Sequence, residues 1–335
     1  MHYLEKIRIK IFGIFEEIIP MQPIHTAQSV VYFNDEGYQA LRLLWTQKKY
    51  ASVFLLMDEN THQYCLAPFM ASLAWDKPME LIELPSGEQN KQLFFCQSVW
   101  EQLSELGADR KSLLINLGGG VITDMGGFVA STFKRGLKFI NIPTTLLSMV
   151  DASVGGKTGV DLGTLKNQIG LFSNPEMVLV DMDFLNTVSK REMRSGLAEI
   201  IKYGFTFDQK LWSTIKEFTE IDMNKITKLV YTSVVIKNDV VLQDLHENSL
   251  RKSLNFGHTI GHAIDEGILA KLNGSFADML YGMTTHPGML EYLDNVDSAG
   301  ERSEQAKHCR RKPDCQAGLN DNLGRELLKL HTVSV

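Results

Sequence analysis

The sequence predicts an α/β domain built on a mainly parallel sheet, followed by an all-helical domain. Between residues 21 and 188, short apolar runs alternate with longer amphipathic stretches. Several of these runs are apolar on both faces, as is typical of strands in a parallel sheet covered by helices. From residue 189 to about residue 265 the apolar residues instead recur at i, i+3 and i+4, which indicates helices.

Each expected element corresponds to one such run. The expected strands are SVVYF, SVFLLMD, MELIELP, SLLINLGGG, FINIPTT and MVLVDMDFL. The clearest helical runs are LAEIIKYGF and ITKLVYTSVVIKNDVV. We place the α/β domain at residues 21–188 and the helical domain at residues 189–296.

The composition is that of an ordinary globular protein. The 335 residues are 44% hydrophobic and 22% charged, enough for two domains with sizeable cores. The net charge of -6 argues against general nucleic-acid binding, which requires a basic surface. The 4 cysteines form no CxxC pair and are too few for a disulfide scaffold, so we expect a reducing, cytoplasmic location.

The two ends of the chain differ from the rest. In residues 1–20, charged side chains interrupt every apolar run, which argues against a signal peptide and a membrane span. Two interpretations stay open for this segment: an extension upstream of a start at Met21, or a short amphipathic surface helix. Residues 297–335 are predicted to be a disordered or aberrant tail, because Leu319 and Leu323 are the only large apolar side chains up to residue 326. We favour this over a metal-binding role for the stretch KHCRRKPDC.

A glycine turn follows one of the expected strands. Gly118, Gly119 and Gly120 end the run SLLINLGGG, and Asp124 follows four residues after Gly120. Without Cβ atoms, such a turn brings backbone N–H groups close to a pyrophosphate, and a helix that begins there adds its dipole. We expect a nucleotide at the carboxyl ends of these strands. A simple chain reversal is the alternative, since the spacing is not GxGxxG.

Two further loops carry lysines. PSGEQNK places Glu88 and Lys91 directly after a strand, and a long loop, IPTTLLSMVDASVGGKTGVDLGTLKNQIG, carries Lys157 and Lys166 among small residues. Small neighbours let ammonium groups and backbone approach a phosphate or carboxylate together. We therefore expect an anionic ligand at these loops.

Two helical motifs predict a buried polar site. In SGLAEIIKYG, Glu199 and Lys202 share a helix face whose flanks are apolar. A surface ion pair is the simple alternative, but a buried Glu or Lys needs a metal, a ligand or a counter-charge. In LNFGHTIGHA, His258 and His262 stand at i and i+4, a spacing by which one helix offers two imidazoles to a single site.

Taken together, GGGVITDMGGF, STFKRG, IPTTLLSMVDASVGGKTGVD, LKNQIG, SGLAEIIKYG and LNFGHTIGHA resemble the 3-dehydroquinate synthases, in the same order and with matching spacing. The resemblance covers about residues 21–265. It implies a Rossmann-like NAD-binding domain, an all-α metal- and substrate-binding domain, and a homodimer. It also implies conversion of 3-deoxy-arabino-heptulosonate 7-phosphate to 3-dehydroquinate and phosphate in the shikimate pathway, with catalytic NAD and a divalent metal, Zn or Co.

The resemblance also implies the site residues. For NAD they are Asp58, Ser86, Gly87, Glu88, Lys91, Gly119, Gly120, Val121, Asp124, Thr144, Thr145, Lys157, Lys166, Phe184 and Thr187. For the substrate and catalysis they are Asp151, Lys157, Asn167, Lys202, Lys237, Arg251, Asn255 and His262, with Arg135 lent to the neighbouring subunit. The metal ligands are Glu199 and His258.

Beyond about residue 265 the sequence departs from the family's pattern. The family's third metal ligand, a histidine in an HGEA segment, is absent from AKLNGSFADMLYGM, and the phosphate-site DKK segment is absent too. His286, in TTHPG, is a weak candidate for the third ligand. We therefore expect weakened metal affinity and low or absent cyclase activity, and interpret residues 266–335 as a frame change or aberrant end.

Three rival functions stay open. Another sugar phosphate cyclase would share nearly every motif, and a metal- and NAD-dependent alcohol dehydrogenase would show net NADH production. A remnant that binds NAD but lacks a complete metal site is the non-enzymatic alternative.

Overall fold

The computed structural model describes residues 21–163, 165–216 and 223–255. Within them, a seven-stranded sheet has the order β1-β2-β9-β6-β5-β3-β4. All neighbouring strands run parallel except β1, which pairs antiparallel with β2. Its strands are β1 (Ile24–His25), β2 (Val30–Phe33), β3 (Val53–Asp58), β4 (Glu80–Leu84), β5 (Leu113–Gly118), β6 (Lys138–Pro143) and β9 (Val178–Val180). The predicted parallel sheet is confirmed.

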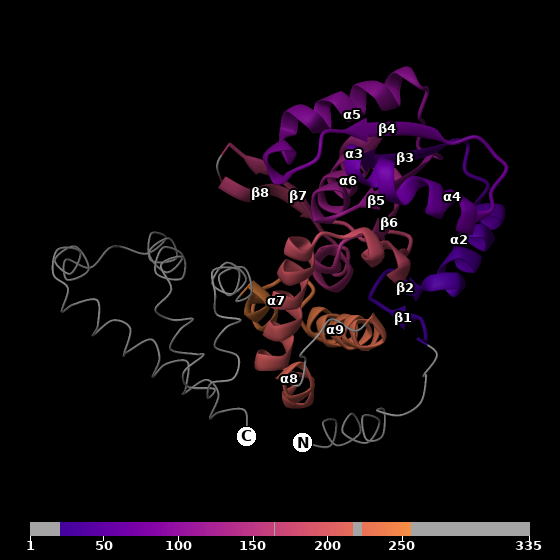
Figure 1. Cartoon of the computed structure of the whole chain (residues 1–335). Helices are drawn as coiled ribbons and strands as arrows, with labels where there is room; N and C mark the ends of the chain where they lie inside the picture. Colours follow the sequence, from indigo (N-terminus) through magenta and orange to yellow (C-terminus); the bar gives the residue numbers. More distant parts are fainter. Residues whose placement is uncertain (1–20, 164, 217–222, 256–335) are drawn as a thin grey trace, which may run out of the picture.

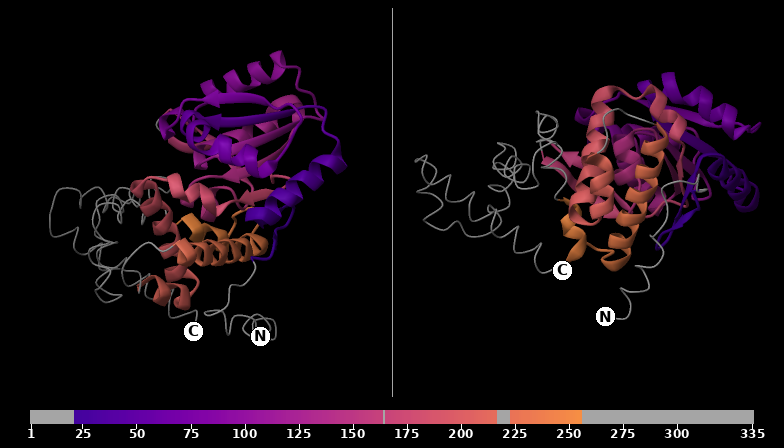
Figure 2. Two further views of the ribbon diagram at one scale, coloured as in Figure 1. Left: turned by 45° about the vertical axis from the view of Figure 1, so that its right-hand side comes forward. Right: turned by 60° about the horizontal axis from the view of Figure 1, so that its bottom comes forward.

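Helices cover both faces of this sheet (Figures 1 and 2). Strand β5 shows why: Leu113, Ile115 and Leu117 face one apolar cluster, whereas Leu114 faces the other. Because successive side chains of a strand point to opposite faces, a run of apolar residues requires cover on both. The covering segments are α2 (Asn34–Lys48), α3 (Glu59–Thr61), α4 (Ala67–Leu73), α5 (Leu93–Glu105) and α6 (Gly120–Thr132), with the π-helical turn η1 (His62–Leu66) and the 3₁₀ turns η2 (Glu88–Asn90) and η3 (Phe133–Arg135).

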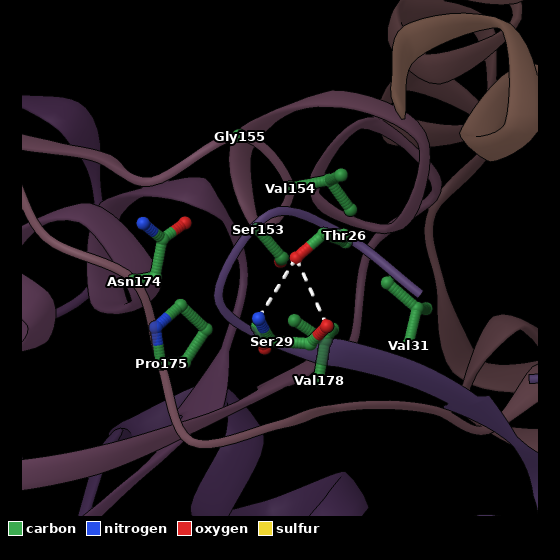
Figure 3. Close-up of a pocket in the computed structure, with 9 residues that line it drawn as sticks. All are labelled: Thr26, Ser29, Val31, Ser153, Val154, Gly155, Asn174, Pro175 and Val178. Carbon is green, nitrogen blue, oxygen red and sulfur yellow. Dashed lines mark hydrogen bonds between the residues drawn. The ribbon is translucent and has the colours of Figure 1, made fainter. Parts of the chain in front are cut away.

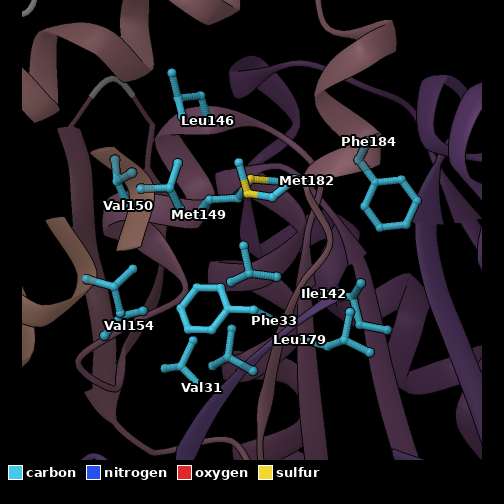
Figure 4. Packing of buried hydrophobic residues seen from close by; sticks show 14 of the residues in the cluster. Val31, Phe33, Ile142, Leu146, Met149, Val150, Val154, Leu179, Met182 and Phe184 are labelled. Carbon is cyan, nitrogen blue, oxygen red and sulfur yellow. The ribbon is translucent and has the colours of Figure 1, made fainter. Parts of the chain in front are cut away.

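The larger apolar cluster joins the sheet to the helices that follow it (Figure 4). Phe33 and Leu179 come from β2 and β9, while Leu146 and Met149 come from the segment after β6. Ile200, on the first long helix beyond the sheet, belongs to the same cluster. Continuous packing of this kind fixes the helical part against the carboxyl ends of the strands.

The helical part begins at α7 (Lys190–Thr206), where the Ser189 hydroxyl oxygen caps the helix by accepting the Glu192 N–H at 3.2 Å. It continues with α8 (Gln209–Lys216), α9 (Met223–Gln243) and the 3₁₀ segment η6 (Leu250–Asn255). The predicted helices of LAEIIKYGF and ITKLVYTSVVIKNDVV are confirmed as α7 and α9. Among the described residues, none of the helices is both long enough and apolar enough to cross a membrane.

The expected single loop from residue 142 to residue 170 is wrong in its second half. Strands β7 (Lys157–Leu162) and β8 (Leu165–Phe172) form an antiparallel hairpin. Gly159 and Gly170 face each other in it, and a Cβ on Gly170 would lie 2.4 Å from the Thr158 carbonyl oxygen. The small residues that resemble loop composition are thus needed for close strand approach.

Three smaller differences complete the comparison with the predicted elements. The run MVLVDMDFL forms only the short strand β9 before the chain turns into the 3₁₀ segment η5 (Met182–Thr187). Strand β1 and helix α8 were not predicted. Residues 1–20 and 256–335, on which the predictions for both ends of the chain fall, lie outside the described residues.

Candidate active site

The glycine turn lies at the carboxyl end of β5 and opens helix α6. Gly119 is the N-cap residue, and its neighbours Gly120 and Val121 begin the helix, so the first N–H groups of α6 are aimed at the space beyond the sheet. A Cβ on Gly119 would come within 3.1 Å of the Thr145 side chain. Thr144, in the adjoining turn after β6, donates its N–H to the Gly118 carbonyl at 3.0 Å. This arrangement suits a pyrophosphate at a helix N-terminus.

The loop after β4 lies beside this turn and is tied to the end of β3. Asp58, the last residue of β3, caps α3 by accepting the Thr61 N–H at 2.8 Å. Glu59 then accepts two bonds from Ser86, from its N–H at 2.9 Å and its hydroxyl at 2.8 Å. Gly87 has φ of 106°, a conformation that favours glycine.

Lys91 ends this loop and is buried, with only 3% of its surface exposed. Its ammonium group donates to Asp124 Oδ2 at 2.6 Å and to Asn167 Oδ1 at 2.7 Å. Burial works to lower the pKa of Lys91, but the carboxylates around it, above all that of Asp124, outweigh burial and raise it. Lys91 is therefore charged at neutral pH. Glu88, in the same loop, pairs with Lys166 of β8 at 3.3 Å.

Asp151 stands in a π-helical turn, η4 (Ser148–Ala152), a form that often occurs at functional sites. Lys237 of α9 donates to both its carbonyl oxygen and its carboxylate at 2.5 Å, and the Tyr203 hydroxyl donates to the carboxylate at 3.1 Å. Burial lowers the pKa of Lys237 and, despite its pairing with Asp151, the net shift is downward. Burial also raises the pKa of Tyr203 well above its usual value.

Helix α7 brings Glu199 and Lys202 to the same region. Glu199 is 4% exposed, Lys202 is fully buried, and the two form an ion pair. The Lys202 ammonium also donates to the Leu254 carbonyl at 2.7 Å. The helix can approach closely because Gly196 has no Cβ, which would lie 2.5 Å from the Leu146 side chain. The predicted burial of the Glu199 helix is confirmed, and the pair is not a surface ion pair.

Segment η6 presents two further predicted residues. Arg251 is 2% exposed and donates to the carbonyls of Gly155 at 2.6 Å and Leu245 at 2.8 Å. The carboxylate of Asp244, buried just after the end of α9, accepts the N–H groups of Asn248, Ser249 and Arg251. Arg251 is therefore held by its own backbone as well as by its guanidinium.

Lys157 opens the hairpin and is 44% exposed. Its ammonium lies 2.5 Å from Glu247 Oε1 and 3.5 Å from Asn255 Oδ1. The hairpin and the end of the helical part thus meet at a cation that the fold leaves partly open to solvent.

Three predicted residues lie apart from these contacts. Arg135 is exposed in η3, with φ of 68° directly after Lys134 with φ of 46°. Phe184 is buried in η5, and Thr187 donates its hydroxyl to the Phe184 carbonyl at 3.1 Å.

The predicted histidines His258, His262 and His286 lie outside the described residues. In the described part of the chain no three His, Cys, Asp or Glu side chains gather so as to hold a metal. Of the two predicted metal ligands only Glu199 is described, and its buried carboxylate is a ligand type that divalent cations accept.

A small pocket lies between the β1–β2 turn and the segment after η4 (Figure 3). Thr26, Ser29 and Ser153 line it together with Gly155. In the turn, the Thr26 hydroxyl accepts the Ser29 N–H at 3.0 Å and donates to the Ser29 carbonyl at the same distance. None of the predicted site residues is among those that line this pocket, so we assign it to packing.

Sequence reasoning missed several residues of this region. Tyr203 stood inside the motif SGLAEIIKYG but was read only as an apolar flank. Asp161, Asp244 and Glu247 contact predicted residues, yet no spacing marks them, because their partners come from elsewhere in the chain.

Comparison with solved structures finds the same fold in other proteins. A 2-deoxy-scyllo-inosose synthase complexed with carbaglucose-6-phosphate, NAD+ and Co2+ matches with a TM-score of 0.65 and 21% identity, over 82% of this chain and 76% of that one. The 2-epi-5-epi-valiolone synthase of Streptomyces hygroscopicus, with NAD+ and Zn2+ bound, matches with a TM-score of 0.64 and 22% identity, over 83% and 89%. At this identity the likeness shows only that this chain and those two proteins share a fold.

Sequence comparison narrows the class further. The model of the 3-dehydroquinate synthase N-terminal region matches residues 81–195, and that of the C-terminal region matches residues 196–308. The 3-dehydroquinate synthase of Parabacteroides distasonis is 41% identical over 247 residues, which are 73% of this chain and 69% of that protein. The chain belongs to the 3-dehydroquinate synthase family.

Proposed function

We propose that the chain is a 3-dehydroquinate synthase, a phosphate-eliminating lyase that converts 3-deoxy-arabino-heptulosonate 7-phosphate to 3-dehydroquinate and phosphate. The observation that carries this is the group of buried cations, Lys202, Lys237 and Arg251, beside the glycine turn. Each of these cations has a partner within the fold, yet three of them gathered in one buried region form a positive site that suits a substrate with a carboxylate and a phosphate. Membership of the family supports the same reaction.

NAD fits the glycine turn, because Gly119 and Gly120 leave the N-terminus of α6 open where side chains would fill it. Bound there, NAD would take a hydride from the substrate and later return it, so that it is not consumed. The residues proposed to hold it are Asp58, Ser86, Gly87, Glu88, Lys91, Gly119, Gly120, Val121, Asp124, Thr144, Thr145, Lys157, Lys166, Phe184 and Thr187. NAD bound to related structures supports the proposal.

A divalent metal, Zn or Co, is the second proposed cofactor, with Glu199 and His258 as ligands. It would supply Lewis-acid polarisation of a substrate hydroxyl. The buried carboxylate of Glu199 supports this, as do the metals bound to related structures. Metal analysis after dialysis tests it: we expect bound metal to be lost in His258→Ala, and a matched His286→Ala variant reports on the weak third candidate.

The cations of this chain would hold the substrate in one orientation through several steps. Lys157 and Asn255 meet at the partly open side of the site and suit the entering anion. Lys237 and Arg251 are fixed by the fold, so they would bind anionic groups with little loss of side-chain freedom. Asp151, held by its bonds to Lys237 and Tyr203, would accept a hydrogen bond from a substrate hydroxyl. Asn167 would donate a hydrogen bond to the substrate from the hairpin.

Proton transfer is assigned to His262, because an imidazole titrates near neutrality. It would take the proton made acidic by the neighbouring ketone. The electrons of that C–H bond would form a carbon–carbon double bond, and the phosphate would leave with the electrons of its C–O bond. The phosphate's own oxygens would assist its departure. Ring opening and an intramolecular aldol closure complete the reaction, with the substrate held in place by the same cations.

We propose that the protein acts in the cytoplasm as a homodimer, with no nucleic-acid or membrane partner. The support for the dimer is Arg135, which lies exposed on a left-handed turn and, in the described part of the chain, bonds to no other predicted site residue. Sedimentation with wild type and Arg135→Ala tests it. We expect both to be dimers, with activity lost only in the variant.

The alternative is that the chain is a different sugar phosphate cyclase. The observation behind this alternative is the fold shared with a 2-deoxy-scyllo-inosose synthase and a 2-epi-5-epi-valiolone synthase. A panel of sugar phosphates, with phosphate release measured in the presence of NAD and Zn or Co, separates the two. We expect release from the heptulosonate phosphate alone. Release from another sugar phosphate would identify a different cyclase, and none from any, with NAD still bound, would identify a catalytically impaired remnant.

A further inference from the structure

A continuous set of hydrogen bonds joins the hairpin to the nucleotide-side loop. Asp161, near the end of β7, is 5% exposed and accepts the Asn167 N–H on its Oδ1 at 2.7 Å. Asn167 Oδ1 in turn accepts from Lys91 Nζ at 2.7 Å, and Lys91 also bonds to Asp124 on α6. Asp161 closes the set, because its own N–H donates to the Lys91 carbonyl at 2.8 Å.

Asp161 lies where the hairpin is irregular. Val160 pairs with Ile169 and Leu162 with Leu165, so one residue of β7 faces three residues of β8. Asn167, in the middle of the three, has φ of 54°. Such irregularities re-aim side chains and are frequent next to active sites, while a left-handed asparagine needs local hydrogen bonds to stay in place.

The carboxylate of Asp161 supplies that bond. It holds the Asn167 backbone in the left-handed form, and in this form the Asn167 amide oxygen points to Lys91. Without Asp161 the Asn167 N–H would lose its acceptor, and because Asn167 itself is exposed, nothing else in this bond would hold its backbone in the left-handed form. Lys91 would then keep its hydrogen bond to Asp124 but lose the one to the Asn167 amide oxygen.

We propose that Asp161 is a positioning residue, which presets Asn167 and Lys91 for the cofactor and substrate through the Asn167 backbone. The proposal rests on the proposed function of this site. It assigns a role to a residue that touches neither ligand and acts through its acceptor oxygen. Its negative charge adds only secondarily.

The experiment measures NAD affinity by calorimetry and the kinetic constants for the heptulosonate phosphate. Asp161→Ala removes the acceptor, whereas Asp161→Asn keeps an oxygen in the same place. We expect the alanine variant to bind NAD about ten-fold more weakly and the asparagine variant to stay within about three-fold of wild type, since a lost hydrogen bond to a carboxylate has this magnitude. The kinetic change should fall mainly on KM.

Asp109→Ala is the matched control, because Asp109 also accepts a backbone N–H, that of Lys111 at 2.7 Å, but in an exposed turn away from Lys91. It should leave NAD affinity unchanged. If Asp161→Ala folds poorly, Asn167→Gly keeps the backbone form and removes the amide oxygen, and we expect the same loss of NAD affinity.

Unchanged NAD affinity in Asp161→Ala or in Asn167→Gly would overturn the proposal, as would equal damage from Asp161→Asn and Asp161→Ala. If the wild-type protein itself bound no NAD, the proposed function would fail instead. The two failures are therefore distinguishable.

Discussion

The lysines of helices α7 and α9 differ from those of the β7–β8 hairpin in their burial and pairing. Lys202 on α7 and Lys237 on α9 are buried and paired with Glu199 and Asp151. The side chains of Lys157 and Lys166 on the hairpin are 44% and 60% exposed. The ammonium groups of α7 and α9 are thus held in place before any ligand binds. Those of the hairpin are exposed and can move to contact a ligand. Charges that are fixed in advance stabilise the transition state, whereas mobile charges contribute mainly to substrate binding.

The largest expected effect comes from removing the buried ammonium group of Lys202. Lys202→Met removes a fully buried ammonium and the ion pair that it makes with the buried Glu199 carboxylate. We expect turnover to fall about 100-fold or more, and unfolding free energy to fall by about 3–5 kcal/mol. Steady-state kinetics and chemical denaturation measure the two.

A double variant and a surface control sharpen this. Adding Glu199→Gln to Lys202→Met should restore most of the stability but none of the turnover, because both charges of the buried ion pair are then removed together. Lys190→Met, at the exposed start of the same helix, should change neither. Normal turnover in Lys202→Met would show that the pair is structural.

The hairpin should respond differently to the same substitution. Lys157→Met should raise KM about ten-fold with a smaller change in kcat, because an exposed cation contributes to binding more than to rate. Its unfolding free energy should change by less than about 1 kcal/mol, the usual size for an exposed ion pair. A stability loss as large as that of Lys202→Met would remove the distinction between the two regions.

The smallest expected effect concerns Asp244, which organises the backbone that carries Arg251. Desolvation works to raise the pKa of Asp244, but bonds from the N–H groups of Ser249, Asn248 and Arg251 outweigh it and lower the pKa to about 2. A carboxyl whose pKa is lower in the folded state stabilises the fold above its unfolded pKa, and this contribution is lost as pH falls to about 2.

We therefore expect wild type to lose stability between about pH 4 and pH 2 more steeply than Asp244→Asn. Thermal unfolding across that range measures the difference. Parallel curves for the two proteins would show that Asp244 holds no such bonds.

The fold was more predictable than the contacts of the site. Burial of Glu199 and Lys202 followed from their apolar neighbours, and the parallel strands followed from runs apolar on both faces. The hairpin could not be recognised, since Gly159 and Gly170 are typical of loops. In the structure they face each other across the two strands.

Pairs distant in the chain were beyond any spacing rule. Lys91 and Asn167 are 76 residues apart, and Lys237 lies 86 residues from Asp151. The sequence placed Lys91 with the cofactor and Asn167 with the substrate, whereas in the structure they bond directly. Only the fold of the intervening strands brings such residues together.

The central claim is that NAD is used and regenerated within one reaction. Following NADH absorbance and phosphate release together, with purified protein, NAD, Zn or Co and the heptulosonate phosphate, tests it most directly. Because metal affinity is expected to be weakened, we expect phosphate to be released slowly, but in excess of a stoichiometric amount of NAD and with no accumulation of NADH. NADH rising in step with substrate consumption would contradict the account and identify a dehydrogenase.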